Sequence, residues 1–215
     1  MRIVDLGVTH FLEAYGLQRR LVNEVTLGLH EDSLLLTEHR PVITIGRKGS
    51  WNSIRRSREF LSLRGIEVLS IDRGGDVTYH GPGQLVAYPI FRLKNESRDI
   101  HNFLRFLEKV GNYFLTQYGL VAEKMPGLTG IWIKGKKIGS IGIGIKKWVT
   151  YHGIALNINI SLEPFSFITP CGIEGVETTS LKDIMGREID IEDAKDKLKL
   201  SFDKVSLLAE ADSKV

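Results

Sequence analysis

Between Asp72 and Pro89 the chain reads DRGGDVTYHGPGQLVAYP, with four glycines, an arginine and a histidine placed between two apolar segments. Glycine loses more backbone entropy on folding than any other residue, so two pairs within ten positions need a structural reason. One interpretation is a tight connection between strands. The other is a glycine-lined platform on which Arg73 and His80 are the polar groups. The composition of the stretch leaves both open.

The segments on either side alternate between β and α patterns, and the stretch itself lies between two predicted strands. We expect strands at 34–36, 42–45, 66–71, 85–91, 120–123, 129–133, 137–145 and 149–160. We expect helices at 9–29, 100–118, 179–185 and 190–208. Thr9, Ser97 or Asp99, and Asp190 are the candidate N-caps, and Gly119 is a candidate C-cap. This order predicts an α+β fold, in which residues 1–215 form a single domain with one mixed β-sheet flanked by helices.

The composition is that of an ordinary globular protein: 215 residues, 42% hydrophobic and 26% charged, with a formal net charge of +3. The single cysteine excludes an internal disulfide and any metal site built from several cysteines. We find no signal peptide and no apolar run long enough for a membrane span, so we expect a cytoplasmic protein that does not bind membranes. The weak basic character does not favour nucleic-acid binding.

The basic residues form small clusters. The clearest are Arg47 with Lys48, and Arg55, Arg56 and Arg58. Most such clusters are solvated surface, but a basic rim that meets an acidic protein partner is the functional alternative.

Cys171 and Lys137 are the candidates for nucleophilic chemistry. A lone cysteine is usually a small buried hydrophobe, yet Thr169-Pro170-Cys171-Gly172 is a turn sequence that suits core packing poorly. A thiol needs a nearby base to become a good nucleophile. Lys137 begins an apolar, glycine-rich strand, where a desolvated lysine can accept a proton. The histidines lack metal-ligand spacing, so we expect no metal site, and no phosphate-binding loop is present.

At this point the motifs resemble closely those of the lipoyl(octanoyl) transferases, the octanoyl-carrier-protein:protein N-octanoyltransferases. The resemblance lies in the segments 38–47, 73–84, 137–142, 150–157 and 170–181, and so covers about residues 34–181. The twelve residues from Arg73 to Gln84 carry the most specific motif. Arg40 is a minor departure from the family pattern, and the tail after Leu181 carries no motif.

The resemblance implies a fold like that of biotin and lipoate protein ligases. It implies transfer of an octanoyl group from octanoyl-acyl carrier protein to one lysine of a lipoyl domain, as found in 2-oxoacid dehydrogenase complexes and the glycine cleavage H protein. Cys171 matches the family's nucleophile and Lys137 its general acid/base. The matching motifs also imply a set of substrate-binding residues: Arg73, Gly74, Gly75, Tyr79, His80, Gly81, Gln84, Ser140, Ile141, Gly142, His152, Gly153 and Ala155.

The chemistry of the residues agrees with this expectation. Transfer from a thioester to an amine needs no ATP, which fits the missing phosphate loop, and the phosphopantetheine belongs to the donor, so we expect no cofactor. An eight-carbon chain needs an apolar slot, which the glycines at 74–75 and 139–144 could leave open. We expect His80 to position groups in the site and the protein to be a monomer. The alternatives are an ATP-dependent lipoate or biotin ligase of the same fold, and a non-catalytic binding module in which Cys171 is inert.

Overall fold

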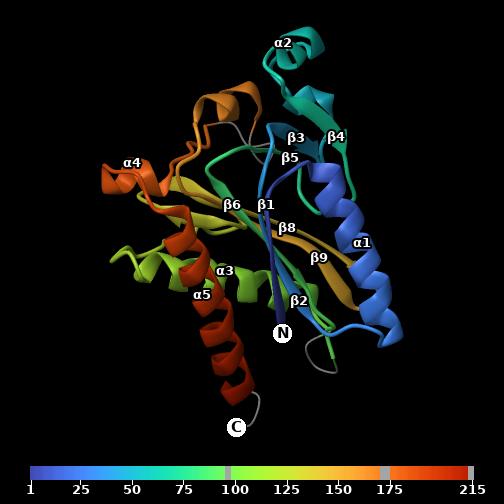
Figure 1. Ribbon diagram of the computed structural model, residues 1–215. Coiled ribbons are helices and arrows are strands. Elements are labelled where there is room, and N and C mark those ends of the chain that lie inside the picture. The colour runs from blue at the N-terminus through green and yellow to red at the C-terminus, as the bar shows by residue number, and fades with distance from the viewer. Residues whose placement is uncertain (95–97, 170–174, 213–215) are drawn as a thin grey trace.

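The computed structural model describes residues 1–94, 98–169 and 175–212, and the strands in these ranges form two mixed sheets (Figure 1). The larger sheet has the order β1-β2-β6-β9-β8-β7. Its members are β1 (Arg2–Thr9), β2 (Ser33–His39), β6 (Gln84–Ile90), β9 (Val149–Asn157), β8 (Lys136–Lys146) and β7 (Ile131–Ile133). The pair β1 and β2 is parallel, and the other neighbours are antiparallel.

The smaller sheet has the order β4-β3-β5 and lies at one end of the larger sheet (Figure 1). Its strands are β3 (Val42–Ile45), β4 (Glu67–Ser70) and β5 (Val77–His80). The pair β3 and β4 is parallel, and β3 and β5 are antiparallel. The 3₁₀ helix η1 (Trp51–Ser53) and the helix α2 (Arg58–Leu63) connect β3 to β4. The 3₁₀ helix η3 (Glu163–Phe167) packs against β5 through Tyr79 and Phe165.

Helices cover both faces of the larger sheet (Figure 1). The amphipathic helix α1 (Phe11–Leu27) packs on one face against Leu35, Val86 and Tyr88. The opposite face is covered by α3 (Ile100–Thr116) and α5 (Ile191–Asp212), which pack on the main core cluster, and α4 (Leu181–Met185) precedes α5. None of the helices in the described ranges is both long and apolar enough to cross a bilayer.

The α+β class, the mixed pairing and most elements are confirmed. Asp99 caps α3, because its Oδ1 accepts hydrogen bonds from the backbone N–H groups of His101 and Asn102 at 2.7 and 3.3 Å. A hairpin joins β7 to β8. Its turn uses positive φ angles of 49° at Lys134 and 72° at Gly135.

Several predictions about the elements are wrong. The strands occupy two sheets rather than one, and β2 and β3, which follow each other in sequence, belong to different sheets. Thr9 is the last residue of β1, so α1 begins at Phe11, and α3 ends at a C-cap on Gln117 rather than Gly119. The segment 120–123 contributes a single bridge from Glu123 to Trp132 instead of a strand.

Candidate active site

Lys137 faces the site because β8 carries a β-bulge. Ile131 pairs with Gly139 and Trp132 with Lys137, so Ile138 is an additional residue on the β8 side. A bulge reverses the alternation of side chains along a strand. Lys137 and Ser140 therefore line the same cavity, although a spacing of three in a regular strand would place them on opposite faces.

Lys137 is held in a closely packed environment and is only 3% exposed. Its Nζ lies 5.4 Å from the centroid of the Trp132 ring. A Cβ at Gly130 would lie 2.8 Å from the Lys137 Cε, so glycine at 130 leaves room for the lysine. The Lys137 backbone also pairs with the segment 177–179: its N–H donates to Glu177 O at 2.8 Å, and its O accepts from Thr179 N–H at 3.0 Å.

Lys137 opens onto a narrow cavity of about 50 Å³ where the two sheets meet on the α1 side of the larger sheet. The cavity brings together nine of the predicted substrate-binding residues: Arg73, Gly75, His80, Ser140, Ile141, Gly142, His152, Gly153 and Ala155. Residues that the motifs did not indicate complete its wall, notably Phe11, Val86 and Tyr88. No local pattern distinguishes these three from ordinary core residues.

Four predicted substrate-binding residues lie behind the cavity wall and support it. Gly74 donates its N–H to Ile143 O at 2.8 Å, which joins the glycine-rich loop to β8. Tyr79 packs its ring on Phe165 at a centroid distance of 5.6 Å. Gly81 lies so close to Tyr79 that a Cβ would come within 2.3 Å of the tyrosine oxygen. The fourth, Gln84, contacts His80.

His80 is buried, and its ring contacts Gln84. Its Nδ1 lies 2.7 Å from Gln84 Oε1, and the Gln84 amide donates to Asn157 Oδ1 at 2.9 Å. Burial, followed by the neighbouring His39, lowers the pKa of His80 to about 3. Burial likewise lowers the pKa of His39 to about 4, and His39 Nε2 lies 2.6 Å from the Tyr88 hydroxyl.

Arg73 brings a positive charge to the cavity. Its Nη2 donates to the Thr44 carbonyl oxygen at 2.7 Å and to the Thr44 hydroxyl at 2.9 Å, and its Nη1 donates to Gly74 O at 3.0 Å. Only 7% of the residue is exposed. Because a guanidinium stays protonated, this charge is permanent.

The glycines of β8 allow close packing. The prediction that the glycines at 139–144 leave an apolar slot open is therefore wrong. A Cβ at Gly139 would lie 2.9 Å from Leu156, and one at Gly142 would lie 3.0 Å from Gly74 O. At Gly144 the aromatic ring of Tyr151 fills the position, only 2.3 Å from where the Cβ would be. The glycines therefore bring the 73–76 loop and Tyr151 onto the sheet.

A polar network centred on Asp72, which no motif indicated, borders the cavity. The carboxylate accepts hydrogen bonds from the hydroxyls of Tyr15 and Tyr151 at 2.9 and 2.8 Å. Arg19 pairs with it at 3.2 Å, and His152 Nε2 lies 3.1 Å from Oδ1. Burial alone would raise the pKa of Asp72, but the hydrogen bonds from Tyr151, His152 and Tyr15 outweigh it and lower the pKa to about 2.

Cys171 lies outside the described residues, but the segments on both sides of it are placed. Thr169 donates its N–H to Ser53 O at 2.8 Å, and Arg55 donates to the Thr169 hydroxyl at 3.1 Å. On the other side, Glu177 is bonded to Lys137. Within the described ranges, no cluster of His, Cys, Asp and Glu could hold a metal ion.

Comparison with known proteins identifies the group to which this arrangement belongs. Residues 10–203 match the family model described as the lipoyl protein ligase A/B catalytic domain. The octanoyltransferase of Geobacter sulfurreducens is 49% identical over 195 residues, which cover 91% of this chain and 80% of that protein. The octanoyltransferase of Caldicellulosiruptor saccharolyticus is 44% identical over 207 residues, which cover 95% and 88%.

Solved structures establish the fold. A putative lipoate protein ligase from T. acidophilum with bound lipoic acid superposes with a TM-score of 0.74 at 16% identity, covering 95% of this chain and 85% of that one. The biotin protein ligase of Aquifex aeolicus superposes with a TM-score of 0.56 at 12% identity, covering 95% and 68%. The predicted lipoate and biotin protein ligase-like fold is therefore confirmed.

Proposed function

The chain belongs to the lipoyl protein ligase A/B catalytic domain family and is an acyltransferase of octanoyl groups in protein lipoylation, and on that premise we propose its donor, acceptor and mechanism. The donor is octanoyl-acyl carrier protein, and the acceptor is one lysine of a lipoyl domain. Cys171 carries the octanoyl group between them as a thioester, and Lys137 moves the protons. The non-catalytic binding module considered from the sequence is thereby set aside.

In the first half-reaction, Cys171 Sγ attacks the thioester carbonyl while the Lys137 amine takes the thiol proton. The tetrahedral intermediate collapses by breaking the bond from the carbonyl carbon to the phosphopantetheine sulfur. Lys137 then returns the proton to the leaving thiolate. The products are free carrier protein and octanoyl-Cys171, so atoms and charge balance.

In the second half-reaction, the lipoyl-domain amine attacks octanoyl-Cys171, and Lys137 accepts one of its protons. The bond from the carbonyl carbon to Cys171 Sγ breaks, an amide forms, and the proton passes to Sγ. Amide formation from a thioester is downhill, so no ATP is consumed.

The burial of Lys137 at the cavity is the observation that carries this proposal. A lysine that only contributed charge would be solvated, whereas this one is directed inwards by the bulge at Ile138. Its backbone bonds to Glu177, six residues after Cys171. Six extended residues span at most about 20 Å, so the chain length between Glu177 and Cys171 permits the thiol to approach Lys137.

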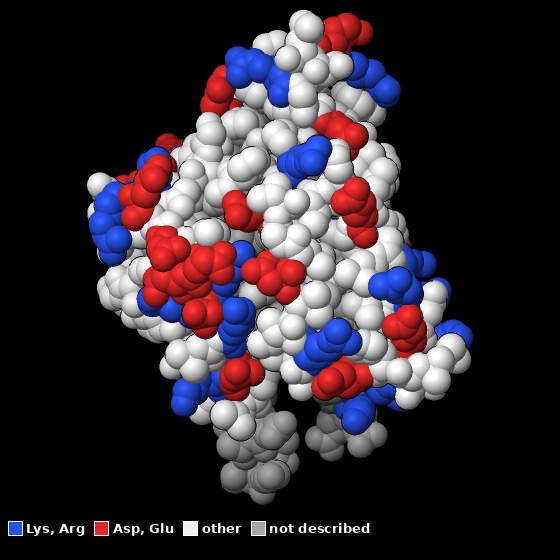
Figure 2. Space-filling model, in the orientation of Figure 1, with Lys and Arg blue, Asp and Glu red and all other residues white. Residues whose placement is uncertain are grey.

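The basic tip of the molecule supports an acidic protein partner. Residues 46–65 hold six basic residues and one acidic residue, although the whole chain has a net charge of only +3. Figure 2 shows Lys and Arg side chains on both sides of this tip, around α2. Arg55 links the tip to Thr169, two residues before Cys171. A carrier protein bound there would meet the segment that leads to the proposed nucleophile.

The decisive experiment incubates the protein with octanoyl-acyl carrier protein, without ATP or acceptor, and locates the adduct by peptide mass spectrometry. We expect one octanoyl group on Cys171 and none in Cys171→Ala. Lys137→Met keeps the length of the side chain but removes the amine, so it should slow acylation by at least 100-fold. Lys134→Met, an exposed lysine in the adjoining turn, is the matched control and should acylate normally.

Two results would overturn the proposal. One is full transfer activity in Cys171→Ala. The other is modification of the lipoyl domain only when ATP is supplied, which would indicate the ligase alternative.

A further inference from the structure

The Asp72 network holds one residue of the cavity wall, His152, through both its backbone and its ring. His152 has a φ of 55°, which is unusual for a residue other than glycine inside a strand. Its backbone N–H donates to the Gln18 side chain at 2.7 Å. Its ring stacks on Tyr15 with a centroid distance of 5.4 Å and an angle of 6°. Together with the Asp72 contact, these interactions hold both the backbone and the ring of His152.

The contact with Asp72 also sets the chemical form of the ring. An ionised carboxylate can only accept hydrogen bonds, so the Nε2 of His152 is the nitrogen that carries the proton. Burial lowers the pKa of His152 to about 4 despite the raising effect of Asp72. At neutral pH the ring is therefore uncharged, and an uncharged ring stacked between aromatic side chains can form part of an apolar wall.

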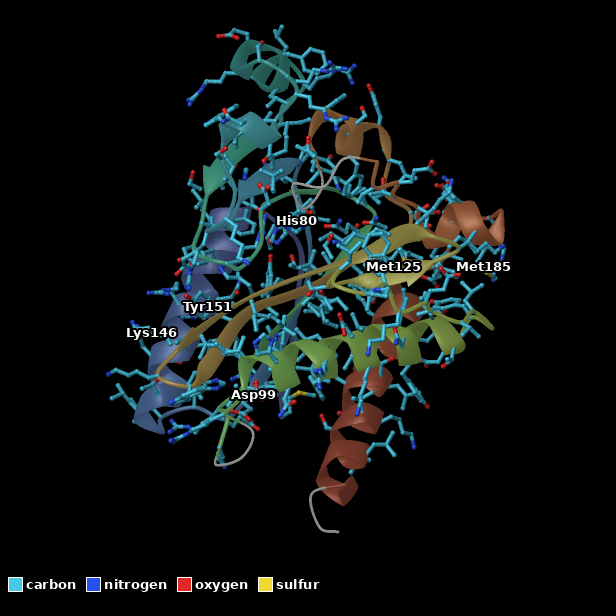
Figure 3. All side chains as sticks on the ribbon, turned by 180° about the vertical axis from the view of Figure 1, so that it is seen from behind. His80, Asp99, Met125, Lys146, Tyr151 and Met185 are labelled. Carbon is cyan, nitrogen blue, oxygen red and sulfur yellow. The ribbon has the colours of Figure 1, made fainter. Side chains whose placement is uncertain are left out.

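Strand register places His152 at the end of the cavity that is far from Lys137. Ser140 pairs with Ala155, Gly142 with Gly153 and Ile143 with His152, so the cavity follows β8 and β9 away from Lys137. Phe11 also lines the cavity, with its ring 6.4 Å from that of His152. Figure 3 shows the preceding residue, Tyr151, on the side of the sheet where α1 lies.

The distance along β9 from Ala155 to His152 matches the length of the proposed acyl group. Three residues of a strand from Ala155 to His152 span about 10 Å. An extended octanoyl chain has seven carbon–carbon bonds of about 1.5 Å, which advance about 9 Å along a zigzag. An acyl group whose carbonyl lies near Ser140 and Lys137 would therefore place its last carbon against His152.

We infer that His152 is the end stop that sets the acyl-chain length and that Asp72 is the positioning residue that keeps this stop in place. This inference rests on the proposed function, because it concerns the acyl group of the same site. A wall that cannot move rejects a chain with two more carbons by steric conflict. If the wall can yield, those carbons become buried. Burial stabilises the bound acyl chain by about 0.8 kcal/mol for each methylene, so the two extra methylenes strengthen binding of the decanoyl group about 15-fold.

The test compares hexanoyl, octanoyl, decanoyl and dodecanoyl thioesters of pantetheine as donors for wild type, Asp72→Ala, His152→Ala and the double variant. The measured quantity is the ratio of kcat/KM for decanoyl to that for octanoyl. We expect this ratio to rise about 15-fold in His152→Ala and at least 5-fold in Asp72→Ala. The double variant should resemble His152→Ala, because Asp72 acts through His152.

A second variant and a matched control keep the test decisive. Asp72→Asn keeps the shape of the side chain and serves if Asp72→Ala does not fold; it should raise the ratio at least 2-fold. Asp203→Asn removes an exposed carboxylate of α5 and should leave the ratio unchanged. In the wild type, the ¹⁵N spectrum of His152 at pH 7 should show the neutral Nε2–H tautomer.

The outcomes separate this inference from the proposed function. If the wild type acylates with none of the donors, the proposed function fails. If the wild type accepts octanoyl but the variants at 72 and 152 keep its chain-length profile, the end stop is refuted. If Asp72→Ala and His152→Ala each raise the decanoyl-to-octanoyl ratio and the two fold-changes multiply in the double variant, the positioning role of Asp72 is refuted.

Discussion

Gly153→Ala should destabilise the protein strongly, because no free space surrounds this position. A Cβ at residue 153 would lie 2.2 Å from the Ala87 carbonyl oxygen and 2.7 Å from Pro89 Cδ. Both atoms belong to β6, which is hydrogen-bonded to β9 in the middle of the larger sheet. A backbone oxygen held by strand pairing cannot rotate away as a side chain can, so the two strands must separate locally.

The expected cost lies at the upper end of the range for overpacking, about 3 kcal/mol. With an m-value of about 3 kcal/mol per molar urea, the midpoint of unfolding should fall by about 1 M. Gly16→Ala is the matched control, since a Cβ at that position in α1 would meet no atom within 4 Å. That substitution should raise stability by about 1 kcal/mol, because alanine is the better helix former.

Urea unfolding at pH 7, followed by far-UV circular dichroism, measures both variants. The reasoning about the packing of β6 against β9 is refuted if Gly153→Ala unfolds within about 0.5 kcal/mol of the wild type. A loss of transfer activity without a loss of stability would mean that the strands adjust and only the cavity changes.

Two further predictions concern acid and charge. The pKa values of His39, His80 and His152 fall to about 4, 3 and 4 in the folded protein, below the value of about 6.5 in the unfolded chain. The unfolded state therefore binds more protons than the folded state below pH 6.5. Urea titrations should show the free energy of unfolding falling steadily from pH 7 to pH 4, by up to about 4 kcal/mol per pH unit. A free energy of unfolding that does not change with pH would contradict the burial of the three rings. Lys48→Glu should raise the KM for octanoyl-acyl carrier protein at least 5-fold and leave the KM for octanoyl-pantetheine unchanged. Arg20→Glu on α1 is the control and should change neither KM. If Lys48→Glu leaves the KM for the carrier protein unchanged, Lys48 does not contact the carrier protein.

Local signals in the sequence were sufficient for elements that depend on local interactions. Asp99 precedes an apolar pattern of helical spacing, and Asp99 is the cap that begins α3. Lys134 and Gly135 follow an apolar run, and they form the turn between β7 and β8. In these cases the residues that specify the structure are adjacent in the chain.

Tertiary arrangement decided the elements that could not be predicted. β1 is an edge strand with mostly exposed or partly exposed residues, so it lacks the apolar alternation that marks a strand. β5 lies within the glycine-rich stretch, where the turn signals mask it. The separation of β2 from β3 depends on which partners they find far along the chain, and Arg40 and Pro41 between them gave no sign of it.

In the candidate site, too, some residues can be identified from local sequence, whereas the contacts that position them are visible only in the fold. The motif identified Lys137, but only the pairing with Trp132 shows the bulge that turns Lys137 toward Ser140. Asp72 directly precedes the motif, yet its partners come from α1 and β9, about 55 and 80 positions away. A sequence motif names residues that act, whereas the contacts that hold them are distributed over the fold.

The position of the cavity at the junction of the two sheets explains why so much of the motif is devoted to glycine. The loop after β4 must lie flat on β8, and it does so through the bond from Gly74 N–H to Ile143 O and the bare face of Gly142. The same loop carries Arg73 into the cavity and Asp72 to α1. The residues that join the small sheet to the large one are therefore the residues that shape the cavity. It follows that a change which loosens this junction alters the site before it unfolds either sheet.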